Sequence, residues 1–138
     1  MGDGMSDNAN SRRASWVGWV FSGIVIVALA ADAVVDLFSP ALISAEMEAT
    51  GFPASQATLL GLIILVCVIL YAIPRTAVLG AILTTGFLGG AICVHFRLGE
   101  IGSPPQLISL LLGVMAWGGL YLRDERLRSL LPIRSSLG

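Results

Sequence analysis

Long apolar stretches alternate with short polar segments along the whole chain. The apolar stretches cover residues 16–38, 56–73, 76–96 and 107–122. Each is close to the ~20 apolar residues that an α-helix needs to cross ~30 Å of hydrocarbon. The pattern predicts an all-α integral membrane protein whose transmembrane domain, residues 16–132, is a four-helix bundle. Residues 1–15 are expected to form a disordered polar N-terminus, and residues 133–138 a C-terminal tail.

The segment after the first apolar stretch has the features of a short helix. Ser39 is a favourable N-cap residue, Pro40 suits the first helical position, and Gly51 suits the residue that ends the helix. Ile43 and Met47 share one face because residues four apart are neighbours on a helix. We therefore expect a short interfacial helix at the outer mouth of the bundle.

The basic residues indicate the orientation of the bundle. All eight are arginines, and all but Arg97 fall on one side of the predicted spans. If the N-terminus is cytoplasmic, this distribution obeys the positive-inside rule. Trp16, Trp19, Tyr71 and Tyr121 then lie at the cytoplasmic headgroup level, where amphipathic rings are favoured. We predict that both termini are cytoplasmic.

A secretory signal is the competing interpretation of the first apolar stretch. Arg12 and Arg13 precede it, and residues 28–30 (Ala-Leu-Ala) resemble an A-x-A cleavage site. The apolar run nevertheless continues through Val34 and Leu37, which is longer than a usual signal core. Cleavage would also unbalance the remaining spans, so a retained first helix is the simpler account.

Composition excludes several classes of function. With 56% hydrophobic residues and a net charge of -1, the chain has no room for a separate soluble domain. The expected surroundings are a lipid bilayer, and nucleic acid is excluded as a partner. No cluster of histidine and cysteine has metal-ligand spacing, so no metal site is expected. Cys67 and Cys93 differ in height by about 18 Å, too far for a disulfide within the chain, and are interpreted as small packing residues.

Small residues predict where the spans pack. Gly86 and Gly90 form a small-xxx-small motif, and Gly89 extends a neighbouring row. Gly113 and Gly119 belong to a comparable face on the fourth span. Such faces suit either packing within the chain or the seam of a homodimer. Packing within the chain is favoured because antiparallel spans already require close contacts of this kind.

Ionisable residues inside the spans are the candidate functional groups, because charge in hydrocarbon is costly and seldom kept without a role. Asp32 and Asp36 lie one turn apart on the first span. By helical rise, Asp32 sits ~24 Å above Trp16 and His95 ~30 Å above Arg75. These residues therefore reach similar depths near the outer surface.

Arg97 and Glu100 belong to the same outer rim, so Asp32–His95 and Asp36–Arg97 are predicted neighbours across the bundle mouth. The short helix adds further carboxylates at this level: Glu46 and Glu48. As a site, a carboxylate that orients His95 would let the ring relay protons or hydrogen-bond a quinone carbonyl. As structure, the same groups would satisfy one another and hold the mouth together. One histidine beside a carboxylate is not a specific catalytic signature, so no catalytic residue is assigned.

Motifs spread along the chain carry a resemblance to a known family. They are Trp16–Trp19, Pro74–Leu83, Gly86–Ala91, His95–Gly99 and Trp117–Asp124. Together they resemble the DoxX-like family of small bacterial membrane proteins, from Trp16 to Pro132. The resemblance implies a multi-pass four-helix bundle of the bacterial cytoplasmic (inner) membrane. It also implies a family whose name derives from subunits associated with quinone-linked sulfur oxidation and respiratory complexes.

The resemblance also bears on individual residues. Asp32 and His95 match polar positions that the family pattern commonly keeps. Asp36 stands where a basic residue is usual, which replaces an expected ion pair by repulsion between two carboxylates. Ile64 stands where the second span often carries Glu, so an intramembrane carboxylate is missing. Both departures count against a chemistry shared with other members.

Three functions are compatible with these features. The leading expectation is an accessory subunit or assembly partner of a membrane redox complex, with no cofactor and no catalytic activity of its own. The first alternative is a quinone-handling oxidoreductase subunit, which requires an apolar pocket between spans that ends at Asp32 and His95. The second is a small proton-coupled exporter, suggested by a carboxylate in the first helix. Asp32 lies too far outward for a midplane transport site.

Overall fold

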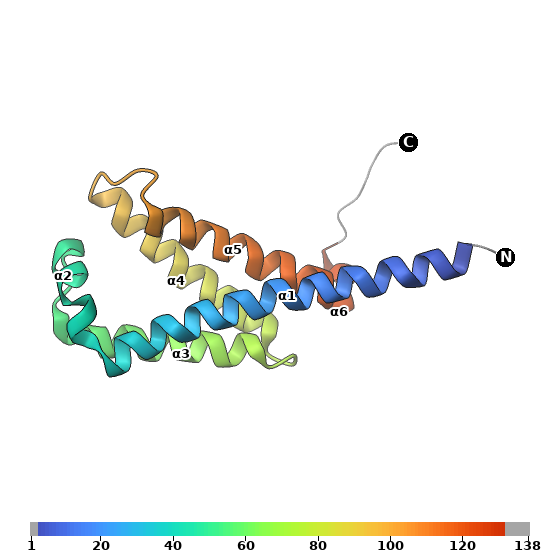
Figure 1. Ribbon diagram of the computed structural model, residues 1–138, viewed down its shortest axis with the longest axis horizontal. Helices are drawn as coiled ribbons and strands as arrows, with labels where there is room; N and C mark the ends of the chain where they lie inside the picture. Colours follow the sequence, from blue (N-terminus) through green and yellow to red (C-terminus); the bar gives the residue numbers. More distant parts are fainter. Residues whose placement is uncertain (1–2, 132–138) are drawn as a thin grey trace.

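The structure is a computed structural model that describes residues 3–131, with the side chains of residues 11–39 and 41–131. Its helices are α1 (Asp3–Phe38), α2 (Pro40–Thr50), the 3-10 turn η1 (Ala54–Gln56), α3 (Ala57–Ala72), α4 (Ala77–Arg97), α5 (Pro104–Arg123) and α6 (Glu125–Leu130) (Figure 1). These residues contain no strand. Four helices (α1, α3, α4 and α5) are long and apolar enough to cross a membrane. The predicted all-α bundle of four membrane-spanning helices is confirmed.

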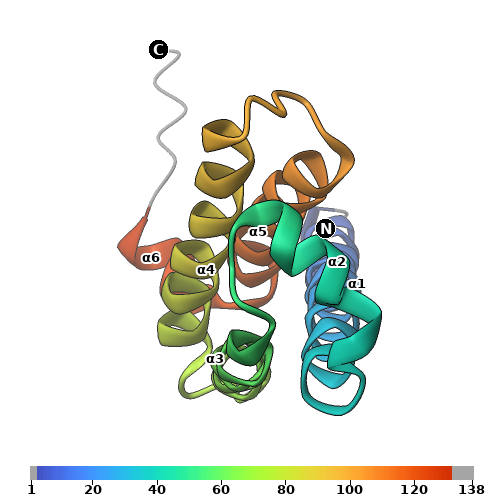
Figure 2. The same cartoon turned by 90° about the vertical axis from the view of Figure 1, so that its left-hand side faces the viewer.

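The spanning helices form a ring of antiparallel neighbours. In this ring α1 packs against α3 and α5, and α4 packs against the other faces of α3 and α5 (Figures 1 and 2). A very tight turn joins α3 to α4, and in it Thr76 Oγ1 donates to the Leu70 carbonyl at 2.8 Å. A Cβ at Gly80 would collide with the Tyr71 backbone, so only glycine allows this close hairpin.

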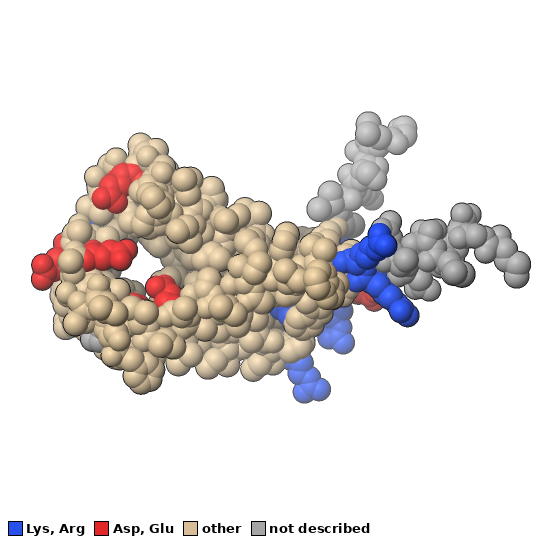
Figure 3. Space-filling model, in the orientation of Figure 1, with Lys and Arg blue, Asp and Glu red and all other residues tan. Residues whose placement is uncertain are grey.

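The two ends of the bundle differ in shape and charge. The α4–α5 hairpin lies close to α1 and α3 near α6, and diverges from them toward the end that α2 crosses (Figures 1 and 2). Acidic side chains gather at the diverging end, where the surface is hollowed, and arginines gather at the other (Figure 3). We call these the acidic end and the arginine end. Each spanning helix therefore presents different chemistry at its two termini.

The outward face of the bundle is apolar. Small and branched side chains fill the core, as at Val25, Ala33 and Ala81, which are at most 1% exposed. Large apolar side chains point outward instead, for example Val27 at 69% and Val114 at 64% exposure. A continuous apolar surface of this kind matches a lipid environment. The chain is therefore a multi-pass membrane protein.

A polar cluster joins three helices near the arginine end. Tyr71 is buried in α3, where its hydroxyl lies 3.1 Å from Ser22 Oγ of α1 and donates to the Ala116 carbonyl of α5 at 2.8 Å. Tyr71 therefore does not present its ring to the lipid headgroups, contrary to the expectation from its place near the end of the span. Its ring faces the bundle because the hydroxyl finds both partners inside, which removes the need for interfacial water.

Helix packing also differs from the expectation at most of the predicted glycines. A Cβ built on Gly86, Gly89 or Gly90 would meet nothing within 4 Å, so no helix packs closely there. A Cβ on Gly113 would meet only Leu88 Cδ1, at 3.9 Å. The predicted close packing at these four positions is corrected. The spacing of small residues shows which face allows close approach, but not whether a helix occupies it.

Close contacts occur at other small residues. A Cβ on Gly119 would lie 2.8 Å from Ser22 Oγ and 3.0 Å from the Gly18 carbonyl oxygen, so α5 and α1 are nearly in backbone contact. A Cβ on Gly61 would lie 2.8 Å from Asp36 Cβ, which places α3 equally close to α1. The seams of the bundle therefore run along α1, and Gly119 is the predicted glycine that lies in one.

The N-terminal flank departs from the prediction. Residues 3–15 continue α1 as helix rather than disorder, since extending an existing helix needs no new nucleus. At the other end, Asp124 Oδ1 accepts from the Arg126 N–H at 2.9 Å and caps α6. Leu127 of α6 is buried against the bundle. The predicted tail, residues 133–138, lies outside the described residues.

Candidate functional site

A cavity of about 380 Å³ opens at the acidic end, between α1, α2, α3 and α4. Its polar wall consists of Asp32, Asp36, Glu46 and His95, and its apolar wall includes Ile43, Met47, Leu60, Ile64, Phe87 and Val94. We call it the rim cavity. The hollow beside the acidic side chains in Figure 3 lies in this part of the molecule. An apolar chamber with a polar side is the usual form of a small-molecule site.

The last two turns of α1 supply two of the carboxylates. Asp36 is only 6% exposed and packs against the backbone of α3 at Gly61, whereas Asp32 is exposed to the cavity. Their spacing of one helical turn puts both on the face of α1 that borders α3 and the rim cavity. The predicted depth match between Asp32 and His95 agrees with this geometry, since both line the rim cavity. No hydrogen bond joins them in the described structure.

The short helix α2 closes the cavity from the outside. Ser39 and Pro40 begin it and Gly51, with φ of 79°, ends it in the left-handed conformation, as the sequence predicts. Arg97 Nη2 donates to the Thr50 carbonyl at 2.7 Å and so ties the end of α2 to α4. The predicted Asp36–Arg97 pairing is therefore wrong, because the guanidinium binds the α2 backbone instead.

His95 is held by a carboxylate that follows it closely in sequence. Its Nδ1 lies 2.7 Å from Glu100 Oε2. The chain reverses at Gly99, with φ of 77°, and the Glu100 N–H donates to the His95 carbonyl at 3.0 Å, which brings the two side chains together. Since a carboxylate only accepts, Nδ1 carries the proton. In its neutral form the ring presents the lone pair of Nε2, which has no hydrogen-bond partner among the described residues.

The charge in the rim cavity is strongly unbalanced. Asp32, Asp36 and Glu46 line it, and no arginine does among the described residues. Arg97 and Glu100 lie outside the lining, so the predicted cluster of acidic and basic groups is only partly assembled. Glu46 was predicted at the rim but not as part of this wall. The wall therefore accepts hydrogen bonds or positive charge and lacks a fixed cation.

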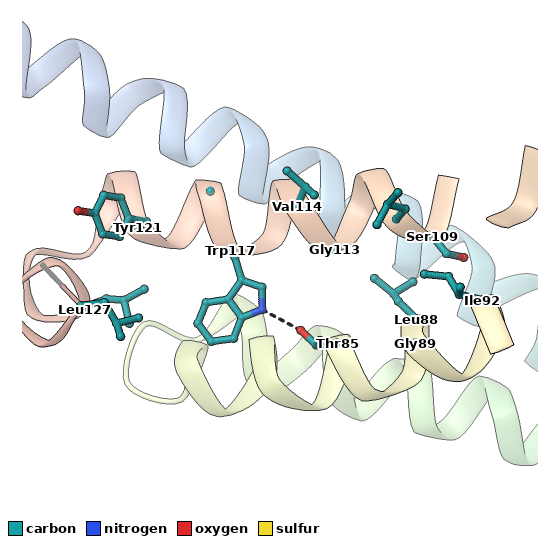
Figure 4. Close-up of a pocket in the computed structure, with 13 residues that line it drawn as sticks. Thr85, Leu88, Gly89, Ile92, Ser109, Gly113, Val114, Trp117, Tyr121 and Leu127 are labelled. Atoms are coloured by element: carbon teal, nitrogen blue, oxygen red, sulfur yellow. Dashed lines mark hydrogen bonds between the residues drawn. The ribbon is translucent and has the colours of Figure 1, made fainter. Parts of the chain in front are cut away.

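A second hollow of about 670 Å³ lies between α4 and α5 (Figure 4). Trp117 Nε1 crosses it and donates to Thr85 Oγ1 at 2.8 Å, as Figure 4 shows. Most of its other lining residues are apolar or small, and among the described side chains no Asp, Glu, His or Arg lines it. We call it the α4–α5 groove. It can hold an apolar chain but has no charged group to orient a reacting ligand.

Residues 3–131 contain no assembled metal site and no disulfide. No group of three or more His, Cys, Asp and Glu side chains there is placed to hold a metal ion. Cys67 is buried, Cys93 is exposed, and both are free.

Comparison with known proteins adds one result. A model of the DoxX-like family matches residues 20–119, which include every residue that lines the rim cavity. Ile64, an expected departure from the family pattern, is 1% exposed and forms part of the cavity wall. No curated protein and no solved structure matches the chain.

Proposed function

The chain belongs to the DoxX-like family, and from the geometry of the rim cavity we propose that it is an accessory membrane subunit that binds a quinol ring for a redox partner. It has no redox centre of its own in this proposal. The observation that carries it is the orientation of His95, whose Nδ1 is fixed on Glu100 while the ring lines a cavity with one acidic and one apolar wall. A quinol is an apolar ring with hydroxyl donors at opposite edges.

The hydroxyls of a quinol match the acceptors that the cavity offers. One hydroxyl donates to Nε2 of His95, and the other to a carboxylate of the same cavity, Asp32 being the exposed one. Phe87 and Ile64 supply apolar surface for the ring. The volume of about 380 Å³ falls within the range of ~300–1,000 Å³ usual for small-ligand sites.

The same arrangement accounts for the protons of oxidation. A quinol that becomes a quinone gives up two protons and two electrons. In this proposal the protons pass to His95 and Asp32, and the electrons pass to a redox centre on the partner. His95 contacts Glu100, whose side chain is 51% exposed, so a proton received by the ring has a short route to water at the acidic end. With the arginine end cytoplasmic, that release is outward.

The excess of carboxylates supports a second candidate function. An amphipathic organic cation would also find negative charge and aromatic surface in the rim cavity, as in proton-coupled export. This candidate is less favoured because Asp32 and Asp36 lie in the last two turns of α1 rather than at mid-helix. A transport site needs access from both sides of the membrane.

The structure offers a matched pair of variants to test the proposal. A Cβ on Gly90 or on Gly89 meets nothing within 4 Å, but Gly90 lines the rim cavity and Gly89 lines the α4–α5 groove. Gly90→Leu should therefore fill the site, whereas Gly89→Leu should place the same side chain outside it. Binding of a short-chain benzoquinol is measured as a rise in the unfolding temperature of the purified protein in detergent.

We expect wild type and Gly89→Leu to bind the quinol, and Gly90→Leu and His95→Leu to lose at least about tenfold in affinity. Equal binding by Gly90→Leu, or no binding by wild type, would contradict the proposal. A lipophilic phosphonium cation is the second probe. If wild type binds this cation but not the quinol, and Gly90→Leu loses the cation, the exporter becomes the better proposal than the quinol-binding subunit.

A further inference from the structure

A third hollow, of about 700 Å³, lies at the arginine end. Three stretches far apart in sequence converge on it: the first half of α1, the α3–α4 turn, and the junction of α5 with α6. Its lining contains five arginines: Arg12, Arg75, Arg123, Arg126 and Arg128. We call it the basic pocket. The sequence did not predict that these arginines line one hollow, because there they indicate only the orientation of the bundle in the membrane.

Arg123 lines the basic pocket and is held in place by aromatic rings. Its guanidinium carbon lies 4.5 Å from the centre of the Trp19 ring and 5.2 Å from that of Tyr71. One nitrogen, Nη2, donates to the Tyr71 carbonyl at 3.1 Å. The others, Nε and Nη1, are buried and have no partner among the described residues. Buried charged donors without an acceptor are costly, so this guanidinium is poised for an anion.

The carboxylates near the basic pocket do not supply that anion. Asp124 lines it, but its Oδ1 is used to cap α6 at the Arg126 N–H. Glu125 faces Arg128 at 3.6 Å, and its side chain is 86% exposed. Neither forms an ion pair with Arg123 among the described residues. Five arginines against two carboxylates leave the basic pocket with a clear excess of positive charge.

We propose that the basic pocket binds a phosphate group, supplied by the headgroup of an anionic phospholipid. The planar fork of arginine matches the oxygens of a phosphate in pairs, and several arginines around one hollow exceed what a topology anchor needs. Leu120, Ala77 and Trp19 provide apolar lining beside the arginines, which suits a headgroup attached to acyl chains. An anionic leaflet also attracts basic residues at this depth. Free phosphate shares the same chemistry.

The test uses the full-length protein in mixed micelles that contain phosphatidylglycerol, phosphatidylcholine or added inorganic phosphate. Native mass spectrometry counts the lipids retained as detergent is stripped away. Arg75→Gln is the main variant, because Arg75 lines the pocket yet is exposed and should not affect folding. Arg13→Gln is the matched control, since Arg13 is exposed and lies outside the lining. Arg123→Gln is added because it removes the guanidinium that the aromatic rings hold in the lining.

We expect wild type and Arg13→Gln to retain phosphatidylglycerol in preference to phosphatidylcholine, and Arg75→Gln to retain about tenfold less, the scale of one charge-assisted hydrogen bond. Arg123→Gln should lose more still, and if it does not fold, Arg75→Gln decides. If wild type retains inorganic phosphate as well as it retains phosphatidylglycerol, the phosphate site stands, but a lipid headgroup as its source is overturned. Equal retention by Arg75→Gln and Arg13→Gln would overturn the site itself.

Discussion

His95 shows at the residue scale how a short local turn sets chemistry. The ring is held by Glu100 at 2.7 Å, five residues later in the chain, because Gly99 reverses the backbone in between. Only a residue that tolerates positive φ allows this reversal without strain. The proton is thereby fixed on Nδ1 and the lone pair of Nε2 is left for a ligand. A structural role in the bundle mouth alone would not require this orientation.

Replacing Glu100 separates the orientation of His95 from the stability of the protein. Glu100→Gln keeps an acceptor for Nδ1 but removes the charge, and charge-assisted hydrogen bonds are about twice as strong as neutral ones. We predict a roughly fivefold loss of benzoquinol affinity. The unfolding temperature should barely change, since half-exposed pairs contribute at most ~1 kcal/mol.

Glu48→Gln is the control for that variant, because it makes the same change on α2 at an exposed position outside the rim cavity. Unchanged quinol affinity in Glu100→Gln, or an equal loss in Glu48→Gln, would show that Glu100 does not act through His95.

Individual residues were predictable only where helix geometry decides the outcome. The rise per residue places Asp32 and His95 at one depth, and they do share a cavity. The hydrogen-bond partners of these side chains were not predictable in the same way. Glu100 reaches His95 through the backbone angle at Gly99, and Arg97 binds the end of α2 rather than Asp36. The available signal for the His95–Glu100 contact was the pair Gly99-Glu100, which closely follows the end of the third span.

At the scale of elements, the spacing of glycine did not reveal which helix faces meet. Gly119 and Gly86 are both helical glycines in motifs of small residues, yet only Gly119 touches a neighbouring helix. The bundle is instead joined along α1, with Gly18 and Gly119 on one side and Gly61 on the other. Lipid-embedded helices gain from such backbone contact because apolar side chains alone give no preference for protein over lipid.

The contrast between these glycines gives a direct test. Gly119→Ala places a methyl group 2.8 Å from Ser22 Oγ, so α5 must shift away from α1, and we predict a loss of ~1–3 kcal/mol. Gly86→Ala meets open space and should be neutral or slightly stabilising. Unfolding in a graded denaturing detergent measures both. Equal destabilisation of the two variants would contradict the packing described here.

Element boundaries were predictable to the extent that hydrophobic length determines them. The spans follow from the apolar runs, and the short helix α2 follows from Pro40 and Gly51. The flanks were not, because no apolar pattern governs them. Residues 3–15 extend α1, and Asp124 ends α5 by capping α6, which turns Leu127 into the bundle. The extension of α1 and the start of α6 both depend on local hydrogen bonding rather than on the periodicity of apolar residues.

At the scale of the whole molecule, the two ends carry opposite charge and separate chemistry. Carboxylates and His95 surround the rim cavity at one end, and arginines surround the basic pocket at the other (Figure 3). This polarity agrees with an arginine end that faces the cytoplasm. The proposed quinol site then opens toward the outer surface, and the proposed phosphate site toward the inner leaflet.

The orientation is testable with reporters. Because four helices cross the membrane, both ends of the chain should lie on one side. We predict that a C-terminal green fluorescent protein fusion fluoresces and that a C-terminal alkaline phosphatase fusion is inactive, as cytoplasmic ends require. A phosphatase inserted after Gly102, in the α4–α5 loop at the acidic end, should be active. The reverse pattern would place the rim cavity on the cytoplasmic side.

The central claim is that the rim cavity holds a quinol-class molecule against His95. Native mass spectrometry of the protein, extracted gently from its own membrane, tests it most directly. We predict an adduct of quinone mass on wild type and on Gly89→Leu, and its loss on His95→Ala and Gly90→Leu. A wild-type spectrum without such an adduct, or an adduct that survives in both cavity variants, would contradict the claim.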